Sequence, residues 1–306
     1  MICCGGHNKK IKNMTKLNKT IAILGPTAAG KTNLAIQLAK GHNGEIVCVD
    51  SRTVYRGLDI GTAKPTRKEQ ELVRHHLLDI LDPEEMITAA RFKELAERAR
   101  IDIISRGRLP ILVGGSGLYM DAILYDYKFP GEADMKRRAE LDKLSLQGLK
   151  NKLRDLDPEL YVQTDIDNKR RLIRAIEVSG QPRSMGRQVI KDCLCLGLTM
   201  SNEVARERIR LRLGKMLDDG LMKEVETIGE RFGYDCPALQ VTGYGPFKQV
   251  VFGNTTVSEA LLDAENETMA VYKKQVTWFK RNKEIKWVTG TQEAEELVGE
   301  FLQAKV

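Results

Sequence analysis

One eight-residue segment constrains this chain more than any other. After the apolar run at residues 21–24 the sequence reads GPTAAGKT, which fits the pattern GxxxxGK[ST] at every fixed position. This pattern is typical of a turn between a strand and a helix, where backbone N–H groups and the helix dipole surround a phosphate. The expected diphosphate-binding residues are Gly25, Pro26, Thr27, Ala28, Ala29, Gly30, Lys31 and Thr32. Lys31 adds a positive charge and Thr32 a hydroxyl that can bind Mg²⁺, so we expect a site for a di- or triphosphate with magnesium.

The strands that follow this loop argue against ordinary nucleotide hydrolysis. Hydrolytic enzymes with such a loop carry an acid after an apolar strand to hold magnesium, but the run at residues 109–113 leads into Gly114-Gly115-Ser116. Asp50 instead closes the run at residues 45–49. Because the carboxyl ends of parallel strands meet at one sheet edge, we expect Asp50 to lie beside the phosphate-binding loop. An aspartate in this position can also cap a helix, so both roles stay open.

The segment that begins at Asp50 resembles a known family. Residues 50–65 read DSRTVYRGLDIGTAKP and, after a GPTAAGKT loop, are similar to the tRNA dimethylallyltransferases, also called tRNA isopentenyltransferases or IPP transferases. The similarity continues in HHLLD at residues 75–79, VGGSGLY at 113–119, DNKRR at 167–171, Arg208 with Arg212, Gly243-Tyr244, and QVTWFK at 275–280. The resemblance implies transfer of a dimethylallyl group from dimethylallyl diphosphate to the exocyclic amine of adenosine-37, on the 3′ side of a tRNA anticodon.

The residues and the family chemistry agree. No water has to be activated, which accounts for the missing acid. Lys31 and magnesium at Thr32 would neutralise the leaving diphosphate, and Asp50 would accept a proton from the adenine amine. Ser116 stands where the family usually has threonine, whose hydroxyl bonds the target base, and we expect serine to keep this role.

Two arginines are further catalytic candidates. Arg208 and Arg212 lie four residues apart after Ser201, so they would share one helix face. The family places a basic residue near the donor diphosphate from this region. With Glu203 and Glu207 nearby, surface ion pairs are the alternative interpretation.

An excess of basic residues is consistent with a nucleic-acid partner. The chain has 49 Lys and Arg against 42 Asp and Glu, a net charge of +7 and a pI near 9.0. Basic residues gather at 136–138, 169–174 and 273–283, and such clusters bind phosphates, although many are only solvated helix faces. By resemblance, the tRNA-binding residues are Asp50, Ser51, Arg52, Thr53, Ser116, Arg138, Asp167, Asn168, Lys169, Arg170 and Arg171. Tyr119, Trp278 and Phe279 could stack on an extruded base, or belong to the core.

The order of apolar segments predicts an α/β fold. Strand-like runs lie at residues 20–24, 45–49, 109–113 and 193–199, with a weaker run at 285–288. Helical patterns lie between them, and the clearest runs from Thr88 to Arg106 with Gly107 at its end. This order favours a mostly parallel sheet flanked by helices, as in P-loop NTPases. The core would comprise residues 20–125 and 190–306.

Residues 126–189 are expected to form a helical insertion. They lack strand patterns and carry leucines at helical spacing, including Leu141, Leu144, Leu149 and Leu153. The resemblance implies that this insertion contacts tRNA, although an ordinary crossover elaboration would have a similar sequence. Residues 1–19 are expected to be a disordered extension, with Met14 as an alternative start.

Other features limit the cellular context. No CxxC pair is formed by the cysteines, which lie at 3, 4, 48, 193, 195 and 236, so we expect a reduced, cytoplasmic protein. His75-His76 lack further ligands at metal-binding spacing, so we expect these histidines to be structural. No apolar run approaches the roughly 18 residues of a membrane span. We expect a monomer that binds tRNA and dimethylallyl diphosphate.

Two positions depart from the family pattern. Gly245-Pro246 stand where a basic residue is usual, and proline is expected to force a turn there. Tyr272 replaces a small residue, so a neighbouring helix must leave room for it. No tRNA contacts are expected at 245, 246 or 272.

Three rival functions are retained. A cytokinin-type adenylate prenyltransferase would perform the same chemistry on free AMP, ADP or ATP, but a small acceptor needs no extended basic surface. A P-loop small-molecule kinase would transfer phosphate, which the segment at Asp50 does not favour. A nonenzymatic RNA-binding switch would bind RNA and release no product.

Overall fold

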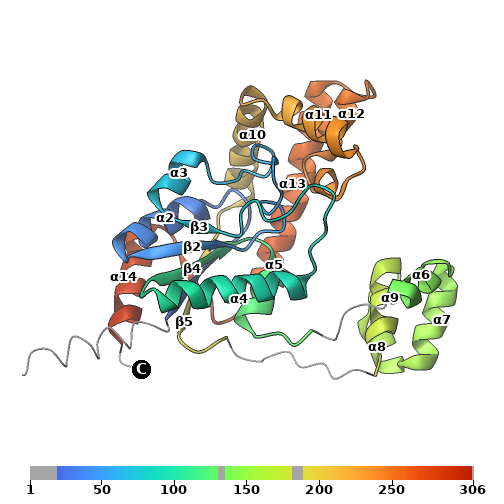
Figure 1. Ribbon diagram of the computed structural model, residues 1–306, viewed down its shortest axis with the longest axis horizontal. Helices are drawn as coiled ribbons and strands as arrows, with labels where there is room; N and C mark the ends of the chain where they lie inside the picture. Colours follow the sequence, from blue (N-terminus) through green and yellow to red (C-terminus); the bar gives the residue numbers. More distant parts are fainter. Residues whose placement is uncertain (1–18, 130–134, 181–188, 305–306) are drawn as a thin grey trace, which may run out of the picture. The chain divides into compact units, whose positions relative to one another are not determined.

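A parallel sheet forms the centre of the fold. The computed structural model describes residues 19–129, 135–180 and 189–304, and in these residues the chain forms one six-stranded sheet (Figure 1). Its strands are β1 (Thr20–Leu24), β2 (Gly44–Cys48), β3 (His75–His76), β4 (Leu109–Gly114), β5 (Cys193–Leu198) and β6 (Lys286–Val288). They lie in the order β3-β2-β4-β1-β5-β6, and every neighbouring pair is parallel. The predicted α/β fold class, with a parallel sheet flanked by helices, is confirmed.

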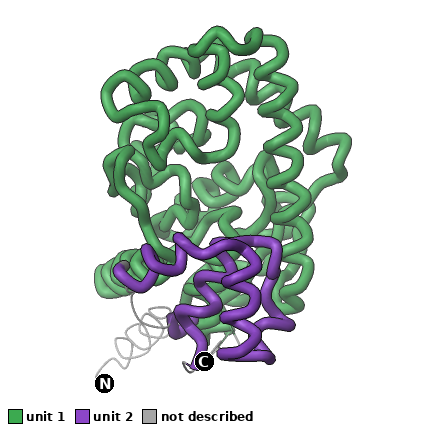
Figure 2. The backbone as a smooth tube through the Cα atoms, turned by 90° about the vertical axis from the view of Figure 1, so that its right-hand side faces the viewer, with its two compact units in different colours: residues 1–126, 188–306 green, residues 127–187 purple. Residues whose placement is uncertain are grey.

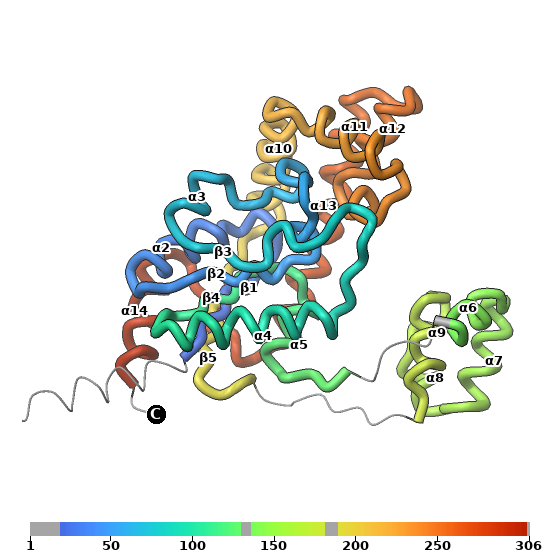
Figure 3. Tube along the Cα trace, viewed as in Figure 1, coloured from blue at the N-terminus to red at the C-terminus, as the bar shows by residue number. Residues whose placement is uncertain are grey.

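Helices cover both faces of this sheet, which is why its central strands are continuous apolar runs. Ile21 and Ile23 of β1 pack with residues of α2 (Lys31–Gly41) and α14 (Thr291–Gln303). Ala22 and Leu24 point to the opposite face and join a second cluster. That cluster includes α4 (Ala89–Ser105), α5 (Gly117–Leu124), α10 (Asn202–Asp218) and α13 (Val257–Phe279). Helices α10 and α13 lie side by side (Figure 3).

The short strand β3 was missed from the sequence because it consists of two histidines. The imidazole Nε2 of His76 lies 2.7 Å from Oε2 of Glu45, and Glu45 also pairs with the guanidinium of Arg106. Hydrogen bonding to Arg106 is the main reason why the pKa of the buried Glu45 carboxyl falls to about 2. His75 and His76 therefore have structural contacts at the edge of the sheet, where His75 Nδ1 lies 2.8 Å from the carbonyl oxygen of Val73.

Helix α4 follows its sequence pattern closely. The hydroxyl of Thr88 accepts a hydrogen bond from the N–H of Arg91 at 3.2 Å, which is the predicted N-terminal cap. Phe92, Ala96 and Ile103 are buried in the core, as their helical spacing predicts. Gly107 follows the helix with φ of 71°, the left-handed conformation that suits glycine at a helix end.

A group of helices follows α10 in the chain. It contains α11 (Leu221–Phe232), the 3₁₀ turn η1 (Pro237–Gln240) and α12 (Gly245–Val251). The prediction that Pro246 forces a chain turn is wrong. This proline instead lies among the first residues of α12, where a helix needs no backbone N–H. Tyr272 is buried and its hydroxyl donates to the carbonyl of Met200 at 2.6 Å, so the larger side chain is accommodated. The short helix α3 (Arg67–Leu72) precedes β3.

The inserted helices form a compact unit of their own. Residues 127–187 separate from residues 1–126 and 188–306, and Figure 2 colours this unit purple. Its helices are α6 (Met135–Asp142), α7 (Leu146–Leu156), α8 (Pro158–Gln163) and α9 (Lys169–Val178). Leu141, Leu149 and Leu153 are buried in its core with residues of α9, whereas Leu144 is 37% exposed because it lies between α6 and α7. The range predicted for this insertion was 126–189.

Of residues 1–19, for which a disordered extension was predicted, the structure describes Lys19 alone. Lys19 is buried, and its ammonium donates to the carbonyl oxygens of Phe301 and Ala304, each at 2.6 Å. Residues 1–18, which include Met14, lie outside the described residues. No helix among the described residues is long and apolar enough to cross a membrane.

Candidate active site

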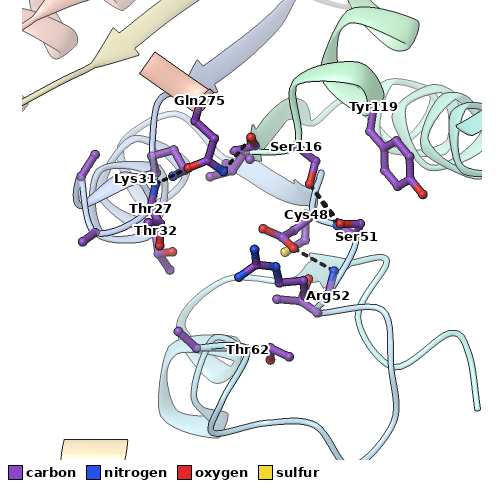
Figure 4. A pocket seen from close by; sticks show the side chains of 18 of the residues that line it. Thr27, Lys31, Thr32, Cys48, Ser51, Arg52, Thr62, Ser116, Tyr119 and Gln275 are labelled. Carbon is purple, nitrogen blue, oxygen red and sulfur yellow. Dashed lines mark hydrogen bonds between the residues drawn. The ribbon is translucent and has the colours of Figure 1, made fainter. Parts of the chain in front are cut away.

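A cavity of about 670 Å³ lies at the carboxyl ends of β1, β2 and β4 (Figure 4). Its volume is typical of a small-molecule site. The lining includes residues 27–32 of the P-loop, 50–53 after β2, 61–63 with Pro65, and 113–119 around the end of β4, together with Arg212, Lys274, Gln275 and Trp278. The structure therefore brings together the P-loop, Asp50 and Ser116, which are far apart in the sequence.

The P-loop has the backbone conformation of an anion-binding turn. Gly25, Ala28 and Gly30 have φ values of 148°, 63° and 86°. A Cβ atom at Gly25 would lie 2.4 Å from the carbonyl oxygen of Leu198, so glycine is required there. Helix α2 begins at Lys31 without a side-chain cap, which leaves the N–H groups of its first turn available to a phosphate.

Lys31 places a desolvated ammonium in this loop. Its Nζ donates to the carbonyl oxygen of Pro26 at 2.6 Å. Burial lowers the pKa of Lys31 to about 8, and the negative charge of Asp50 opposes this shift in part. Since a buried cation is stabilised by an anion, the site favours a negatively charged ligand.

The two candidate arginines differ in the structure. The guanidinium of Arg212 donates to Oγ1 of Thr27 at 2.7 Å, and its buried Nε has no hydrogen-bond partner among the described residues. Burial, followed by the charge of Arg52, lowers the pKa of Arg212. Arg208 is exposed, and its guanidinium lies 3.4 Å from the carbonyl oxygen of Ala28. In the described part of the chain neither arginine forms an ion pair with an acidic residue, so the alternative interpretation as surface ion pairs does not apply.

Asp50 holds the turn that follows β2. Its Oδ1 accepts a hydrogen bond from the backbone N–H of Arg52 at 2.8 Å, an Asx-type turn rather than a helix cap. Across the described ranges, the other carboxylate oxygen accepts no hydrogen bond. The carboxylate lies close enough to Lys31 and Arg212 to act on the pKa values of both.

Ser116 lies next to this turn, before the first residue of α5. Its Oγ accepts a hydrogen bond from the N–H of Ser51 at 3.2 Å and lies 3.4 Å from Ser51 Oγ. The hydroxyl makes no capping bond to α5, and Ser116 lines the cavity. Ser51, Arg52 and Thr53 also line the cavity.

Gln275 is a cavity residue to which the sequence analysis assigned no role, although its motif contributed to the resemblance. Its Oε1 accepts from the N–H of Thr27 and its Nε2 donates to the carbonyl oxygen of Gly115, both at 2.8 Å. One side chain of α13 thus joins the P-loop to the turn after β4 (Figure 4). The loop at 61–65 was also missed, because no short-range pattern indicates that it returns to the cavity.

The three aromatic candidates separate into two groups. Tyr119 and Trp278 line the cavity. Tyr119 also stacks on Phe92 with ring centroids 4.6 Å apart, and the indole N–H of Trp278 donates to Asp121 at 2.8 Å. Phe279 is buried in the core, so the stacking role is wrong for this residue.

The other predicted tRNA-binding residues lie in the helical unit of residues 127–187. Asn168 caps α9 by accepting from the N–H of Arg171 at 3.2 Å. The remaining contacts of this set are Arg138 with Glu177 at 3.0 Å, Asp167 with Lys150 at 2.8 Å, Lys169 with the carbonyl of Asp142 at 2.6 Å, and Arg171 with Asp165 at 3.1 Å. Lys169, Arg170 and Arg171 are exposed at the start of α9, so their charges face solvent.

Comparison with known proteins places the chain in a family. The sequence profile of the IPP transferases matches residues 53–282. The chain belongs to the IPP transferase family. The resemblance that the motifs indicated is therefore confirmed, and the P-loop and Asp50 lie before the matched residues of the chain.

Relatives and solved structures agree with this assignment. A tRNA dimethylallyltransferase from Bacillus cytotoxicus is 38% identical over 282 residues, which cover 88% of this chain and 89% of the relative. The crystal structure of a tRNA isopentenylpyrophosphate transferase from Bacillus halodurans is 36% identical, with 94% and 97% of the two chains covered and a TM-score of 0.72. A eukaryotic dimethylallyltransferase acting on tRNA has a TM-score of 0.84 at 23% identity, with 94% and 80% covered, a likeness that shows the fold alone.

Proposed function

We propose that this protein transfers a dimethylallyl group from dimethylallyl diphosphate to the exocyclic amine of the adenosine on the 3′ side of a tRNA anticodon. The observation that carries the proposal is one cavity in which a P-loop lies opposite a carboxylate and a hydroxyl, Asp50 and Ser116. Curated relatives with the name tRNA dimethylallyltransferase support it. The products are N6-isopentenyladenosine in tRNA and diphosphate.

The donor diphosphate binds to the P-loop. The N–H groups at the start of α2, the ammonium of Lys31 and the guanidinium of Arg212 surround the position of the anion. As the bond between the allylic carbon and the diphosphate oxygen breaks, negative charge grows on the leaving oxygen. These fixed donors stabilise that charge.

A magnesium ion fits this arrangement. The described residues contain no group of three carboxylate, imidazole or thiolate ligands that could hold a metal without help. Mg²⁺ instead takes most of its ligands from water and substrate phosphates, and the Thr32 hydroxyl lines the cavity where such phosphates would lie. When bound, the ion would neutralise charge on the diphosphate.

The acceptor adenine binds on the opposite wall. The Ser116 hydroxyl orients the base, and its amine attacks the allylic carbon as the carbon–oxygen bond breaks. The proton that leaves the amine passes to Asp50, whose second carboxylate oxygen is available. Positioning of two substrates contributes on the order of 7–11 kcal/mol, whereas a general base typically contributes 10²- to 10⁴-fold, so geometry matters more than the base.

The tRNA needs a larger surface than this cavity. The basic residues at the start of α9, Lys169, Arg170 and Arg171, and Arg138 on α6, are proposed to bind its phosphates. Lys273 and Lys274 on α13 are also exposed. An acceptor in tRNA accords with a cytoplasmic location, and the monomeric state stays a prediction.

Mass spectrometry of nucleosides tests the proposal. Purified protein is incubated with magnesium, dimethylallyl diphosphate and an unmodified tRNA that carries adenosine beside its anticodon, with AMP as a parallel acceptor. We expect one adenosine in the tRNA digest to gain a five-carbon group. Prenylation of AMP alone would favour the adenylate prenyltransferase, and phosphoryl transfer from ATP would favour the kinase.

A further inference from the structure

The loop at residues 58–65 forms one wall of the reaction cavity. Gly61, Thr62, Ala63 and Pro65 line the cavity. In the described structure this loop belongs to no helix or strand. Its shape therefore depends on contacts with neighbouring elements, and these contacts decide where the wall stands relative to the substrates.

Glu224 on α11 provides most of those contacts. Its Oε2 accepts hydrogen bonds from the backbone N–H groups of Asp59 and Ile60, at 2.7 and 2.8 Å. Its Oε1 accepts from the N–H of Gly61 at 3.0 Å and from the hydroxyl of Tyr244 at 2.7 Å. Three consecutive N–H groups thus surround one carboxylate, and hydrogen bonds to a charged acceptor are stronger than neutral ones.

Packing at Gly61 shows how closely the loop approaches these helices. A Cβ atom at this position would lie 2.5 Å from Cζ of Tyr244 and 2.9 Å from Cδ1 of Leu221. Tyr244 is fully buried, so it cannot move aside. The loop backbone is therefore in direct contact with the ring whose hydroxyl bonds Glu224.

Lys64 holds the same loop from within. Its buried ammonium donates to the carbonyl oxygen of Tyr55 at 2.8 Å and pairs with Asp59 and Asp79. A turn closes between the N–H of Ala63 and the carbonyl oxygen of Ile60 at 2.9 Å. These bonds shape the turn itself, whereas Glu224 fixes the turn to the helices beside the cavity.

We propose that Glu224, supported by Tyr244, is a positioning residue for the transfer reaction. It holds the wall formed by residues 61–63 at the distance from the P-loop that brings donor and acceptor together. The expected effect on the rate of transfer rests on the proposed function. The contact between Glu224 and the loop does not depend on that function. Loss of the carboxylate should slow the transfer step without weakening the diphosphate site.

The test uses the full chain with the substitution Glu224→Gln. An amide offers one acceptor oxygen in place of two, carries no charge and turns an NH₂ group toward N–H donors. At least one of the three bonds from backbone N–H groups is therefore lost, whereas the Tyr244 hydroxyl can turn and accept from the amide. Tyr244→Phe is the milder variant, because it removes one bond and keeps the ring. Glu230→Gln, an exposed position on the same helix, is the matched control.

Two measurements are compared across these proteins. Hydrogen exchange of the peptide that contains residues 59–61 should be at least tenfold faster in Glu224→Gln, about threefold faster in Tyr244→Phe, and unchanged in Glu230→Gln. The kcat for prenyl transfer should fall at least tenfold in Glu224→Gln, while the affinity for inorganic pyrophosphate stays within twofold.

Unchanged exchange at residues 59–61, or an unchanged kcat, would overturn the proposal. A parallel loss of kcat, pyrophosphate affinity and melting temperature would also overturn it, because that pattern indicates a general structural role. If Glu224→Gln does not fold, hydrogen exchange at residues 59–61 and the kcat of Tyr244→Phe test the proposal instead. If the wild-type protein transfers no prenyl group, the proposed function fails, and the exchange measurement still tests the contact with the loop.

Discussion

Replacing Arg212 by methionine separates recognition of the donor diphosphate from folding. Methionine keeps a long unbranched side chain and removes the charge. Arg212 is a largely buried cation whose pKa is lowered by burial, and its Nε finds no hydrogen-bond partner in the part of the chain that the structure describes. The donor diphosphate would supply the missing acceptor, so we expect the substitution to weaken donor binding and to leave the melting temperature unchanged or raised.

The size of the effect follows from the bonds that the guanidinium can make. A hydrogen bond to a charged group contributes about 1.5–3 kcal/mol. Loss of one such bond from Arg212 to the diphosphate lowers kcat/KM about 10- to 150-fold, since each 1.36 kcal/mol corresponds to a factor of ten. The bond from Nη2 to Thr27 is also lost, but that hydroxyl lines the cavity and can bond water instead.

Arg208→Met is the matched control for this test. It makes the same change one helical turn earlier on α10, at an exposed residue whose contact with Ala28 is 3.4 Å long. We expect less than a threefold effect on kcat/KM. Calorimetric titration with inorganic pyrophosphate and magnesium, together with initial rates of prenyl transfer, measures both variants. Equal losses in the two variants, or wild-type pyrophosphate affinity in Arg212→Met, would refute the reasoning.

Three further predictions concern the base, the pH dependence and the tRNA surface. Asp50→Asn keeps an oxygen for the N–H of Arg52 but cannot accept a proton, so kcat should fall about 10²- to 10⁴-fold. The affinity for tRNA, measured by filter binding, should stay the same. A kcat equal to that of the wild-type protein would exclude Asp50 as the proton acceptor. The diphosphate favours protonated Lys31, whose pKa is lowered to about 8. Because Lys31 loses its proton as the pH rises, the KM for dimethylallyl diphosphate should rise severalfold between pH 7 and 9. A KM that does not change with pH would contradict the role of Lys31 in diphosphate binding. The double substitution Lys169→Ala and Arg170→Ala should weaken tRNA binding. It should also reduce the slope of the logarithm of the tRNA association constant against the logarithm of salt concentration by roughly 1.4–1.8. An unchanged slope would exclude phosphate contacts by these residues.

The sequence predicted the elements whose signals are local. Each central strand is an apolar run buried on both faces, and the predicted ranges differ from β1, β2, β4 and β5 by one residue at most. The P-loop and the cap at Thr88 likewise depend on short-range chemistry. Their local interactions agree with the tertiary fold, which is why a pattern was sufficient.

The missed features depend on contacts between distant residues. β3 is polar and two residues long, so neither composition nor periodicity marks it. Gln275 reaches the cavity only because α13 packs beside the P-loop, 248 residues away in the sequence. The difference between Arg208 and Arg212 is one of burial on a single helix, which sequence spacing cannot supply.

The turn after β4 explains why this site suits group transfer better than nucleotide hydrolysis. A Cβ atom at Gly114 would lie 1.9 Å from the carbonyl oxygen of Val49, and one at Gly115 would lie 2.6 Å from the amide nitrogen of Gln275. The backbone of Val49 therefore excludes an acidic side chain at Gly114, and a side chain at Gly115 would have to displace the amide of Gln275, in the region where P-loop hydrolases hold their second magnesium ligand. The close packing instead draws Ser116 toward the turn after β2, where its hydroxyl meets Ser51 beside Asp50. The end of β4 thus carries no acid, and Ser116 and Asp50 line the same cavity as the P-loop.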